Sequence, residues 1–234
     1  MNAHRDWVSF WDSQHSIYVN ARHFDVHYRD IADGIVALLP RPDLRVLDYG
    51  CGEAIHAGTV ATHAASLTLC ESAPTVRAHL GERFAGNGKI AIVAPEALAA
   101  MPAGSFDVIV VNSVAQYLTP EELDRLLAAW KRLIAPGGAL IVGDVIPPGI
   151  SAVTDLAALL RYAWRNGFFL AALGGVARTL FSDYRVLRRT LGLTTYREAD
   201  FLAKLRAAGF APERLARNLE HHPARMTFRA KVSA

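Results

Sequence analysis

The stretch RVLDYGCGEA, residues 45–54, has the pattern of a short buried strand that runs into a turn containing two glycines. Its apolar residues form a short continuous run, which is typical of a strand covered on both faces. Asp48 lies two residues before Gly50, where the strand ends. Because a glycine turn lets another molecule approach the backbone closely, this stretch predicts a binding crevice with a carboxylate beside it.

Strands and helices alternate on either side of this stretch. Further short apolar runs predict strands, and amphipathic segments between them predict helices. The strands are expected at 45–50, 66–71, 89–93, 106–113 and 139–145, and the helices at 4–39, 54–64, 73–84, 95–100 and 119–134. This alternation predicts an α/β fold with a doubly wound, Rossmann-like sheet.

The pattern changes after residue 150. Helical segments occupy 150–195, where another strand would be expected, and a helix follows at 196–210. Two strand-like runs, 211–219 and 224–232, are separated by EHHP and predict an antiparallel hairpin at the sheet edge. We therefore expect a seven-stranded sheet, mostly parallel, with this hairpin at its C-terminal edge.

The 234 residues, 52% of them hydrophobic and 20% charged, are enough for one elaborated domain with a full core. We expect a single domain over 1–234 with four parts. They are N-terminal helices (1–40), a ligand-binding core (41–149), a helical lid insertion (150–195), and the final helix with the edge hairpin (196–234).

The cysteines and the apolar segments indicate the cellular compartment in which the protein is expected. Cys51 and Cys70 provide neither a disulfide framework nor a CxxC site, which favours a reducing, cytoplasmic location. The N-terminus shows no secretory signal, and Arg161, Arg165 and Asn166 interrupt the longest apolar segment. We therefore expect no transmembrane span.

Charge is distributed unevenly along the chain. Residues 1–150 hold 11 Lys and Arg against 16 Asp and Glu, a net charge of −5, whereas residues 151–234 hold 14 against 6, a net charge of +8. The stretch 159–193 has six arginines, interleaved with Trp164, Phe168, Phe169 and Phe181. This pattern fits a cover for an apolar substrate with an acidic group, peripheral contact with an anionic membrane, or simply a lid with its own core. Nucleic acid is disfavoured, because the basic residues are spread among apolar runs.

The residues of the glycine turn indicate the charge of its ligand. A dinucleotide-binding turn has a third glycine at the position of Ile55, and Asp48 would repel a pyrophosphate. Glu71, at the end of the second strand, is placed to accept hydrogen bonds from the two hydroxyls of a ribose. These features together predict a nucleoside ligand with a cationic tail.

Four segments in order carry a family resemblance: VLDYGCGEA (46–54), LTLCESA (67–73), FDVIVVNSVAQYL (106–118) and LIAPGGALIV (133–142). Over residues 31–146 the chain resembles the class I S-adenosylmethionine-dependent methyltransferases, which implies S-adenosylmethionine as cofactor and S-adenosylhomocysteine as product. The resemblance implies cofactor-binding roles for ten residues. They are Asp48 (amino group), Gly50, Cys51 and Gly52 (methionine part), Glu71 (ribose), Ser72 (adenosine), Glu96 (adenine), Asn112 and Ser113 (near the methyl donor), and Tyr18 on a closing N-terminal helix. The chain departs from the family pattern at Ala54, where the family has a glycine, and at Ala94, where it often has an acid.

Methyl transfer from a sulfonium needs positioning above all, with a base only for a protonated acceptor. The candidate catalytic residues are Tyr117, Asp144 and His23. His23 and His27 share a helix face, but no third ligand lies nearby in the sequence, so no metal site is predicted. His221 and His222 are interpreted as turn residues.

Our leading hypothesis is methyl transfer to a small-molecule acceptor, possibly apolar with an acidic group. The alternative is a catalytically silent protein of the same fold that binds S-adenosylmethionine, a partner or a membrane surface. An aminopropyl transferase is disfavoured, because NSVAQYL (112–118) has no pair of acids. The sequence specifies neither the acceptor atom nor the oligomeric state.

Overall fold

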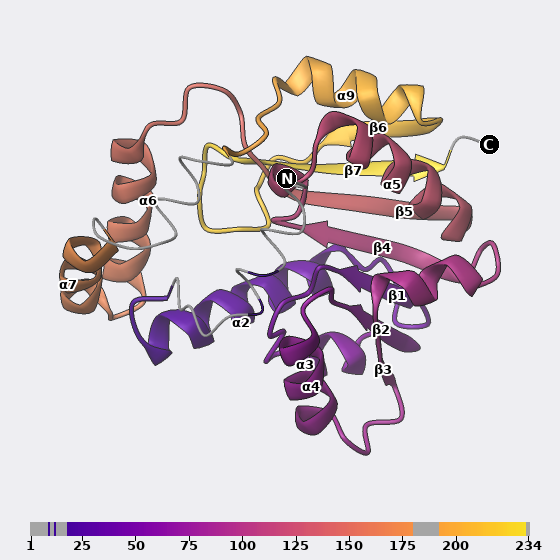
Figure 1. Cartoon of the computed structure of the whole chain (residues 1–234), viewed down its shortest axis with the longest axis horizontal. Coiled ribbons are helices and arrows are strands. Elements are labelled where there is room, and N and C mark those ends of the chain that lie inside the picture. Colours follow the sequence, from indigo (N-terminus) through magenta and orange to yellow (C-terminus); the bar gives the residue numbers. More distant parts are fainter. Residues whose placement is uncertain (1–8, 10–11, 13–17, 180–191, 233–234) are drawn as a thin grey trace.

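The computed structural model describes residues 9, 12, 18–179 and 192–232 (Figure 1). Over these residues the chain forms a seven-stranded sheet in the order β3-β2-β1-β4-β5-β7-β6. The strands are β1 (Arg45–Tyr49), β2 (Ser66–Cys70), β3 (Ile90–Val93), β4 (Phe106–Asn112), β5 (Ile134–Val145), β6 (Phe210–Arg214) and β7 (Met226–Val232). Strands β1 to β5 are parallel, and β7 is antiparallel to both β5 and β6. The predicted α/β sheet and its edge hairpin are confirmed.

Strand order reverses at β1. This strand pairs with β2 on one side and with β4 on the other, so the chain winds outward in opposite directions from the β1–β4 boundary. In open α/β sheets, ligands bind at such a boundary, beyond the carboxyl ends of the strands. The glycine turn that follows β1 lies at this point.

Helices cover both faces of the sheet (Figure 1). Hydrophobic residues of α2 (Ala21–Leu38), α3 (Ala57–Thr62) and α4 (Pro74–Arg83) form one core with the sheet. Residues of α5 (Pro120–Leu133) and α9 (Glu198–Ala207) form a second core, in which Trp130 and Phe201 are fully buried. Each strand of the centre is therefore covered on both sides, which explains its continuous apolar sequence.

The N-terminus of α5 is capped through side chains. Thr119 Oγ1 accepts a hydrogen bond from Glu122 N at 3.2 Å, and Glu122 Oε2 accepts one from Thr119 N at 2.8 Å. Pro120 occupies the first turn, where its missing N–H has no cost. This capping box fixes the start of a helix whose Leu123 and Leu127 are buried.

Thr119→Ala is expected to lower the free energy of unfolding by about 1 kcal/mol, because it removes the cap from a helix that packs on the core. Chemical denaturation would measure the change. Glu121→Ala is the matched control: Glu121 is exposed in the same turn and has no capping role. Equal stability of the two variants would contradict the capping argument.

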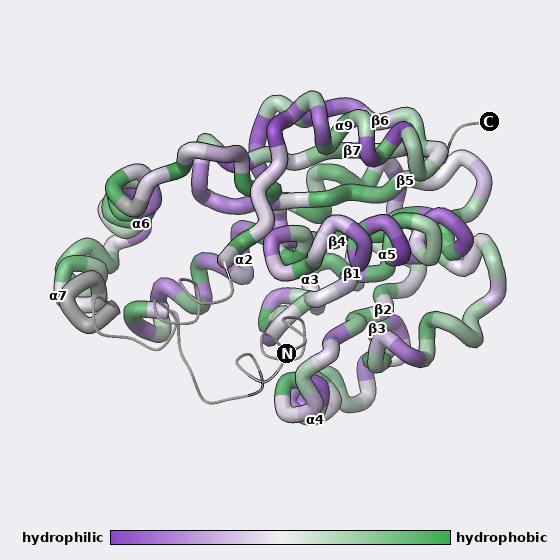
Figure 2. Tube along the Cα trace, turned by 45° about the horizontal axis from the view of Figure 1, so that its top comes forward, coloured by the Kyte–Doolittle hydropathy of each residue, from purple (hydrophilic) through white to green (hydrophobic). Residues whose placement is uncertain are grey.

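Two helices of the insertion lie to one side of the sheet (Figure 1). Tyr162 of α6 (Ala152–Arg165), Ala172 of α7 (Phe169–Thr179) and Phe168 between the two helices form a small core with Val26 of α2. Figure 2 shows α7 as largely hydrophobic. Several apolar side chains of α6 and α7 are exposed. These are Val153, Trp164, Leu170 and Leu173. The helical character of the insertion is confirmed over 152–179, whereas Phe181 and the rest of 180–191 lie outside the described residues.

Three boundaries differ from those expected. β5 begins at Ile134 rather than at residue 139, because Ile134 pairs with Phe106 before a register shift. β6 ends at Arg214 rather than at residue 219, because Asn218 turns the chain inward by bonding to the Asp144 side chain and the His222 carbonyl. Of the helices expected over 4–39, α2 is described in full and residues 9 and 12 are also helical; 1–8, 10–11 and 13–17 lie outside the described residues.

No helix among the described residues is both long enough and apolar enough to span a bilayer.

Candidate functional site

The turn after β1 requires its glycines. Gly50 and Gly52 have φ angles of 72° and 57°, in the left-handed region that other residues rarely adopt. A Cβ atom on Gly50 would lie 2.5 Å from Val114 Cγ2, and one on Gly52 would lie 2.6 Å from Tyr28 Oη. Ala54, where the related family has a glycine, has a φ of 35° and is buried. The turn therefore accommodates this alanine in a conformation that favours glycine.

Asp48 is a buried carboxyl group beside this turn. Its side chain lines a cavity of about 20 Å³ with Tyr28 and Cys51, and the residue is 9% exposed. Burial, and then the negative charge of Glu71, raises the pKa of Asp48 to about 7. Within the described part of the chain, no hydrogen bond or ion pair reaches its carboxylate. A buried carboxylate without a counter-charge is unfavourable, so the position favours a cationic ligand.

Glu71 follows β2 and joins the glycine turn to the next helix. Its Oε2 accepts a hydrogen bond from Gly52 N at 2.9 Å, and its Oε1 accepts one from Ala73 N at 2.9 Å. Ser72 Oγ lies 3.3 Å from Oε1. Arg77 donates to the backbone carbonyls of Glu71 and Ser72. The carboxylate is thus held in a fixed orientation, and Oε2, which accepts one of these hydrogen bonds, keeps a lone pair for a ligand hydroxyl.

The tip of β4 carries two polar residues. Asn112 Nδ2 donates to Glu220 Oε1 at 3.0 Å, while Asn112 Oδ1 is buried without a hydrogen-bond partner. Ser113 has a φ of 56°, and its Oγ lies 3.0 Å from Asp144 Oδ2 and 3.2 Å from Glu220 Oε1. Positive φ angles outside glycine concentrate at functional sites, where the surrounding structure maintains them.

Asp144, at the end of β5, is engaged by neighbouring side chains. It is 2% exposed, accepts from Arg225 Nη1 at 2.6 Å and accepts from Asn218 Nδ2 at 3.1 Å. Burial raises its pKa, and the charge of Arg225 opposes the increase. These contacts suit a residue that holds the β4 tip and the β6–β7 loop in place. A catalytic role for Asp144 stays a prediction.

Several aromatic residues cluster near the glycine turn. They come from the first turns of α2 and from the segment just before this helix. The ring of Tyr18 lies 5.3 Å from that of His23 and 5.2 Å from that of His27, centroid to centroid. Tyr28 Oη accepts a hydrogen bond from Glu53 N at 3.0 Å, directly beside Gly52. Tyr28 was not predicted as a site residue from the sequence, although its i, i+4 spacing from Phe24 places both side chains on one face of α2.

His23 is a buried histidine beside this cluster, and its catalytic role stays a prediction. It is buried and stacks on Phe168 with 4.8 Å between ring centroids. Burial, followed by the nearby His27, lowers its pKa to about 4. Val19 N donates to His23 Nδ1 at 3.4 Å. His23 is therefore a neutral, packed imidazole in this structure.

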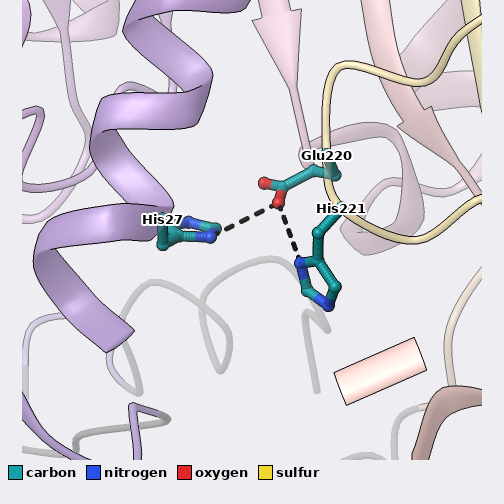
Figure 3. A group of neighbouring side chains, drawn as sticks. All are labelled: His27, Glu220 and His221. Carbon is teal, nitrogen blue, oxygen red and sulfur yellow. Dashed lines mark ion pairs between the residues drawn. The ribbon is translucent and has the colours of Figure 1, made fainter. Parts of the chain in front are cut away.

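Glu220 meets two histidines at the β6–β7 loop (Figure 3). Its Oε2 lies 3.3 Å from His27 Nδ1 and 3.7 Å from His221 Nδ1. Burial of Glu220 raises its pKa, but His27 and His221 outweigh this effect and bring it to about 2. Sequence reasoning missed this group: EHHP was interpreted only as a turn.

The structure divides the predicted site residues among several places. Asp48, Gly50, Cys51, Gly52, Glu71 and Ser72 meet at the ends of β1 and β2. Asn112 and Ser113 meet at the end of β4 with Asp144. Tyr117 is half-buried in a short 3₁₀ helix (Ala115–Tyr117), and Glu96 is exposed in another (Pro95–Ala100). Their roles, like the other site assignments, stay predictions.

Comparisons with known proteins agree with this geometry. Residues 47–142 match the family described as "Methyltransferase domain". Trans-aconitate 2-methyltransferase of Streptomyces avermitilis is 31% identical over 165 residues, which cover 66% of this chain and 59% of that protein. An uncharacterised methyltransferase of Mycobacterium tuberculosis is 27% identical over 126 residues, 54% of this chain and 61% of that protein. The chain thus matches about three fifths of the length of these relatives.

Solved structures share the fold. Magnesium protoporphyrin IX methyltransferase from Synechocystis PCC 6803, solved with bound SAM, superposes over 100% of this chain and 98% of that one, with a TM-score of 0.62 and 16% identity. The structure of a DhpI–SAH complex gives a TM-score of 0.65 at 13% identity, over 99% and 98% of the two chains. The sequence match over the glycine turn and the central strands identifies residues 47–142 as a methyltransferase domain, and the chain shares its fold with the S-adenosylmethionine-dependent methyltransferases that it resembles.

Proposed function

We propose that this protein binds S-adenosylmethionine at the ends of β1 and β2 and transfers its methyl group to a small molecule that carries a carboxylate. The observation that carries the proposal is the pair of buried acids beside the glycine turn. Asp48 lacks a counter-charge within the described residues, and Glu71 is oriented by Gly52 N and Ala73 N. A ligand with an ammonium group and a ribose satisfies both.

Each part of the crevice has a distinct task in this proposal. The cofactor supplies an electrophilic methyl group on its sulfonium. Asp48 orients the cofactor through its ammonium, and Glu71 accepts hydrogen bonds from the ribose hydroxyls. Gly50 and Gly52 let the backbone approach the ligand without a Cβ between them. The polar tip of β4, with Asn112 and Ser113, borders the space for the acceptor, so most of the acceleration comes from positioning.

Two observations favour an acidic acceptor. The relative at 31% identity is named for trans-aconitate, a small carboxylic acid. Residues 151–234, which include the insertion beside α2, have a net charge of +8, because 14 basic residues stand against 6 acidic ones. Positive charge around a crevice raises the local concentration of anionic substrates.

Calorimetry with S-adenosylmethionine and S-adenosylhomocysteine tests the cofactor site, and transfer of radiolabelled methyl groups tests the acceptor. We expect micromolar binding of both cofactor forms, and methylation of trans-aconitate or related dicarboxylates. The trimethyl ester of trans-aconitate, whose carboxyl groups already carry methyl groups and no charge, is the negative control. Failure of both cofactor forms to bind below about millimolar concentration would end the proposal. Equal activity on the acid and the ester would contradict the proposed acidic acceptor but not the proposed cofactor site.

A further inference from the structure

We propose that His27, Glu220 and His221 form a binding site for a divalent transition-metal ion, with Zn²⁺ as the test case. The three residues come from α2 and from the loop between β6 and β7, and their nitrogen and carboxylate atoms all lie within 4.8 Å of one another. Figure 3 shows both imidazoles facing the same carboxylate. Two histidines and one glutamate are a known ligand set for Zn²⁺ with an open coordination position.

The separations between the ligand atoms fit an ion between them. Ligand atoms about 2.1 Å from a tetrahedral ion lie about 3.4 Å from each other. Both Nδ1 atoms converge on Oε2 of Glu220, at 3.3 Å and 3.7 Å. By contrast, His79 Nδ1 and Glu53 Oε1 are 2.9 Å apart, as in a direct hydrogen bond, and have no third ligand group.

Burial provides an independent argument. Only 7% of the Glu220 side chain is exposed, and its ion-pair partners among the described residues are the two histidines. His221 Nδ1 is buried and has no hydrogen-bond partner among the residues that the structure describes. A desolvated carboxylate and a desolvated ring nitrogen are both unfavourable unless a cation is shared between them.

Neighbouring residues hold the three ligands in place. Asn112 Nδ2 and Ser113 Oγ lie 3.0 Å and 3.2 Å from Oε1 of Glu220, which leaves Oε2 for the ion. Tyr162 stacks on His221 with 4.4 Å between ring centroids, and its hydroxyl donates to Asp30 Oδ2 at 2.7 Å. Such outer contacts orient metal ligands and raise metal affinity.

The site lies next to the residues assigned to the methyl donor, because Asn112 and Ser113 both contact Glu220. An open coordination position there would bind a carboxylate or hydroxyl oxygen of the acceptor. This role rests on the proposed function; the binding of the ion does not. A binding measurement without cofactor or acceptor therefore separates the two.

The test uses tag-free full-length protein, freed of metal by a chelator and titrated with Co²⁺ and Zn²⁺. We expect one Co²⁺ per chain, with visible absorption bands that Zn²⁺ abolishes. His221→Asn and Glu220→Gln are each expected to weaken binding at least tenfold. His79→Asn, which alters the matched His–Glu pair, should leave it unchanged. His221→Cys keeps a metal ligand and should retain binding, with a new thiolate-to-cobalt charge-transfer band.

Circular dichroism separates misfolding from loss of a ligand, and the charge-transfer band of His221→Cys identifies the site even if the other variants unfold. Two results would overturn the proposal. One is wild-type protein that binds no stoichiometric Co²⁺ or Zn²⁺, which would mean that the histidines only neutralise Glu220. The other is binding that Glu220→Gln does not weaken, together with a His221→Cys variant whose cobalt complex shows no charge-transfer band.

Discussion

Asp48→Asn is expected to weaken S-adenosylmethionine binding by about 10- to 100-fold at pH 7.5, because a charge-assisted hydrogen bond to the ammonium contributes about 1.5–3 kcal/mol. Asparagine keeps the shape of the side chain and removes its charge. Calorimetry would measure the affinity. Asp107→Asn is the matched control: Asp107 lies on the neighbouring strand at the opposite end of the sheet, where it binds Arg45, and should not affect cofactor binding.

The same variant should remove a pH dependence. Because the pKa of Asp48 is about 7 in the ligand-free protein, the carboxyl group is increasingly protonated below pH 7. We expect the wild-type affinity to fall about tenfold per pH unit between pH 6 and pH 5, and the affinity of Asp48→Asn to change little over this range. An unchanged affinity in Asp48→Asn, or an equal pH dependence in both proteins, would disprove the assignment of Asp48.

The linkage between proton binding and folding gives a second test of Asp48. In this test the variant is expected to be more stable than the wild type, whereas it binds the cofactor less tightly. The folded-state pKa of Asp48 lies above the ordinary value of 3.8, so the folded protein binds the proton more tightly than the unfolded chain does. This contribution to folding stability is lost as pH rises from about 4 to 7. At pH 8 the ligand-free Asp48→Asn protein should therefore be more stable than the wild type, although it binds the cofactor less well.

Gly50→Ala is expected to lower the free energy of unfolding by about 2–5 kcal/mol. A φ of 72° costs an alanine about 1–2 kcal/mol, and the new Cβ would lie 2.5 Å from Val114 Cγ2, which adds about 1–3 kcal/mol of overpacking. Denaturation in urea would measure the loss.

Gly86→Ala separates these two contributions. Gly86 has a φ of 81°, but nothing lies within 4 Å of its would-be Cβ. We expect it to lose only the conformational part, about 1–2 kcal/mol. Gly50→Ala combined with Val114→Ala should recover part of the steric loss. If Gly50→Ala and Gly86→Ala were equally destabilising, the close approach of Val114 would contribute nothing to the loss of folding free energy.

The parts of the fold that depend on local pattern could be predicted from the sequence. The central strands are continuous apolar runs, and Asp48 and Glu71 end neighbouring parallel strands, so their convergence follows from topology. Strand ends were less predictable: Ile134 pairs with Phe106 through a register shift that no local pattern signals.

The grouping of His27 with Glu220 and His221 depends on tertiary structure alone. His27 lies on α2, whose position over the sheet is set by the packing of Ala32 and Ile35. Glu220 is turned inward because Asn218 bonds to Asp144 and to the Glu220 carbonyl. No spacing within either segment encodes this meeting. For the same reason, the sequence did not reveal that Arg225 engages Asp144.

The place of β7 between β5 and β6 affects how the crevice is assembled during folding. β7, the last of the described strands in chain order, pairs with β5 in the interior of the sheet, and β6 then runs parallel to β5. The loop carrying Glu220 and His221 is thereby brought to the same edge as the glycine turn. Because the β5–β7 pairing joins residues far apart in the chain, such as Val142 and Phe228, it has high contact order and is expected to form late. The acceptor side of the crevice would then be completed after the β1–β2 side, and pulsed hydrogen exchange would show Phe228 protected later than Leu47.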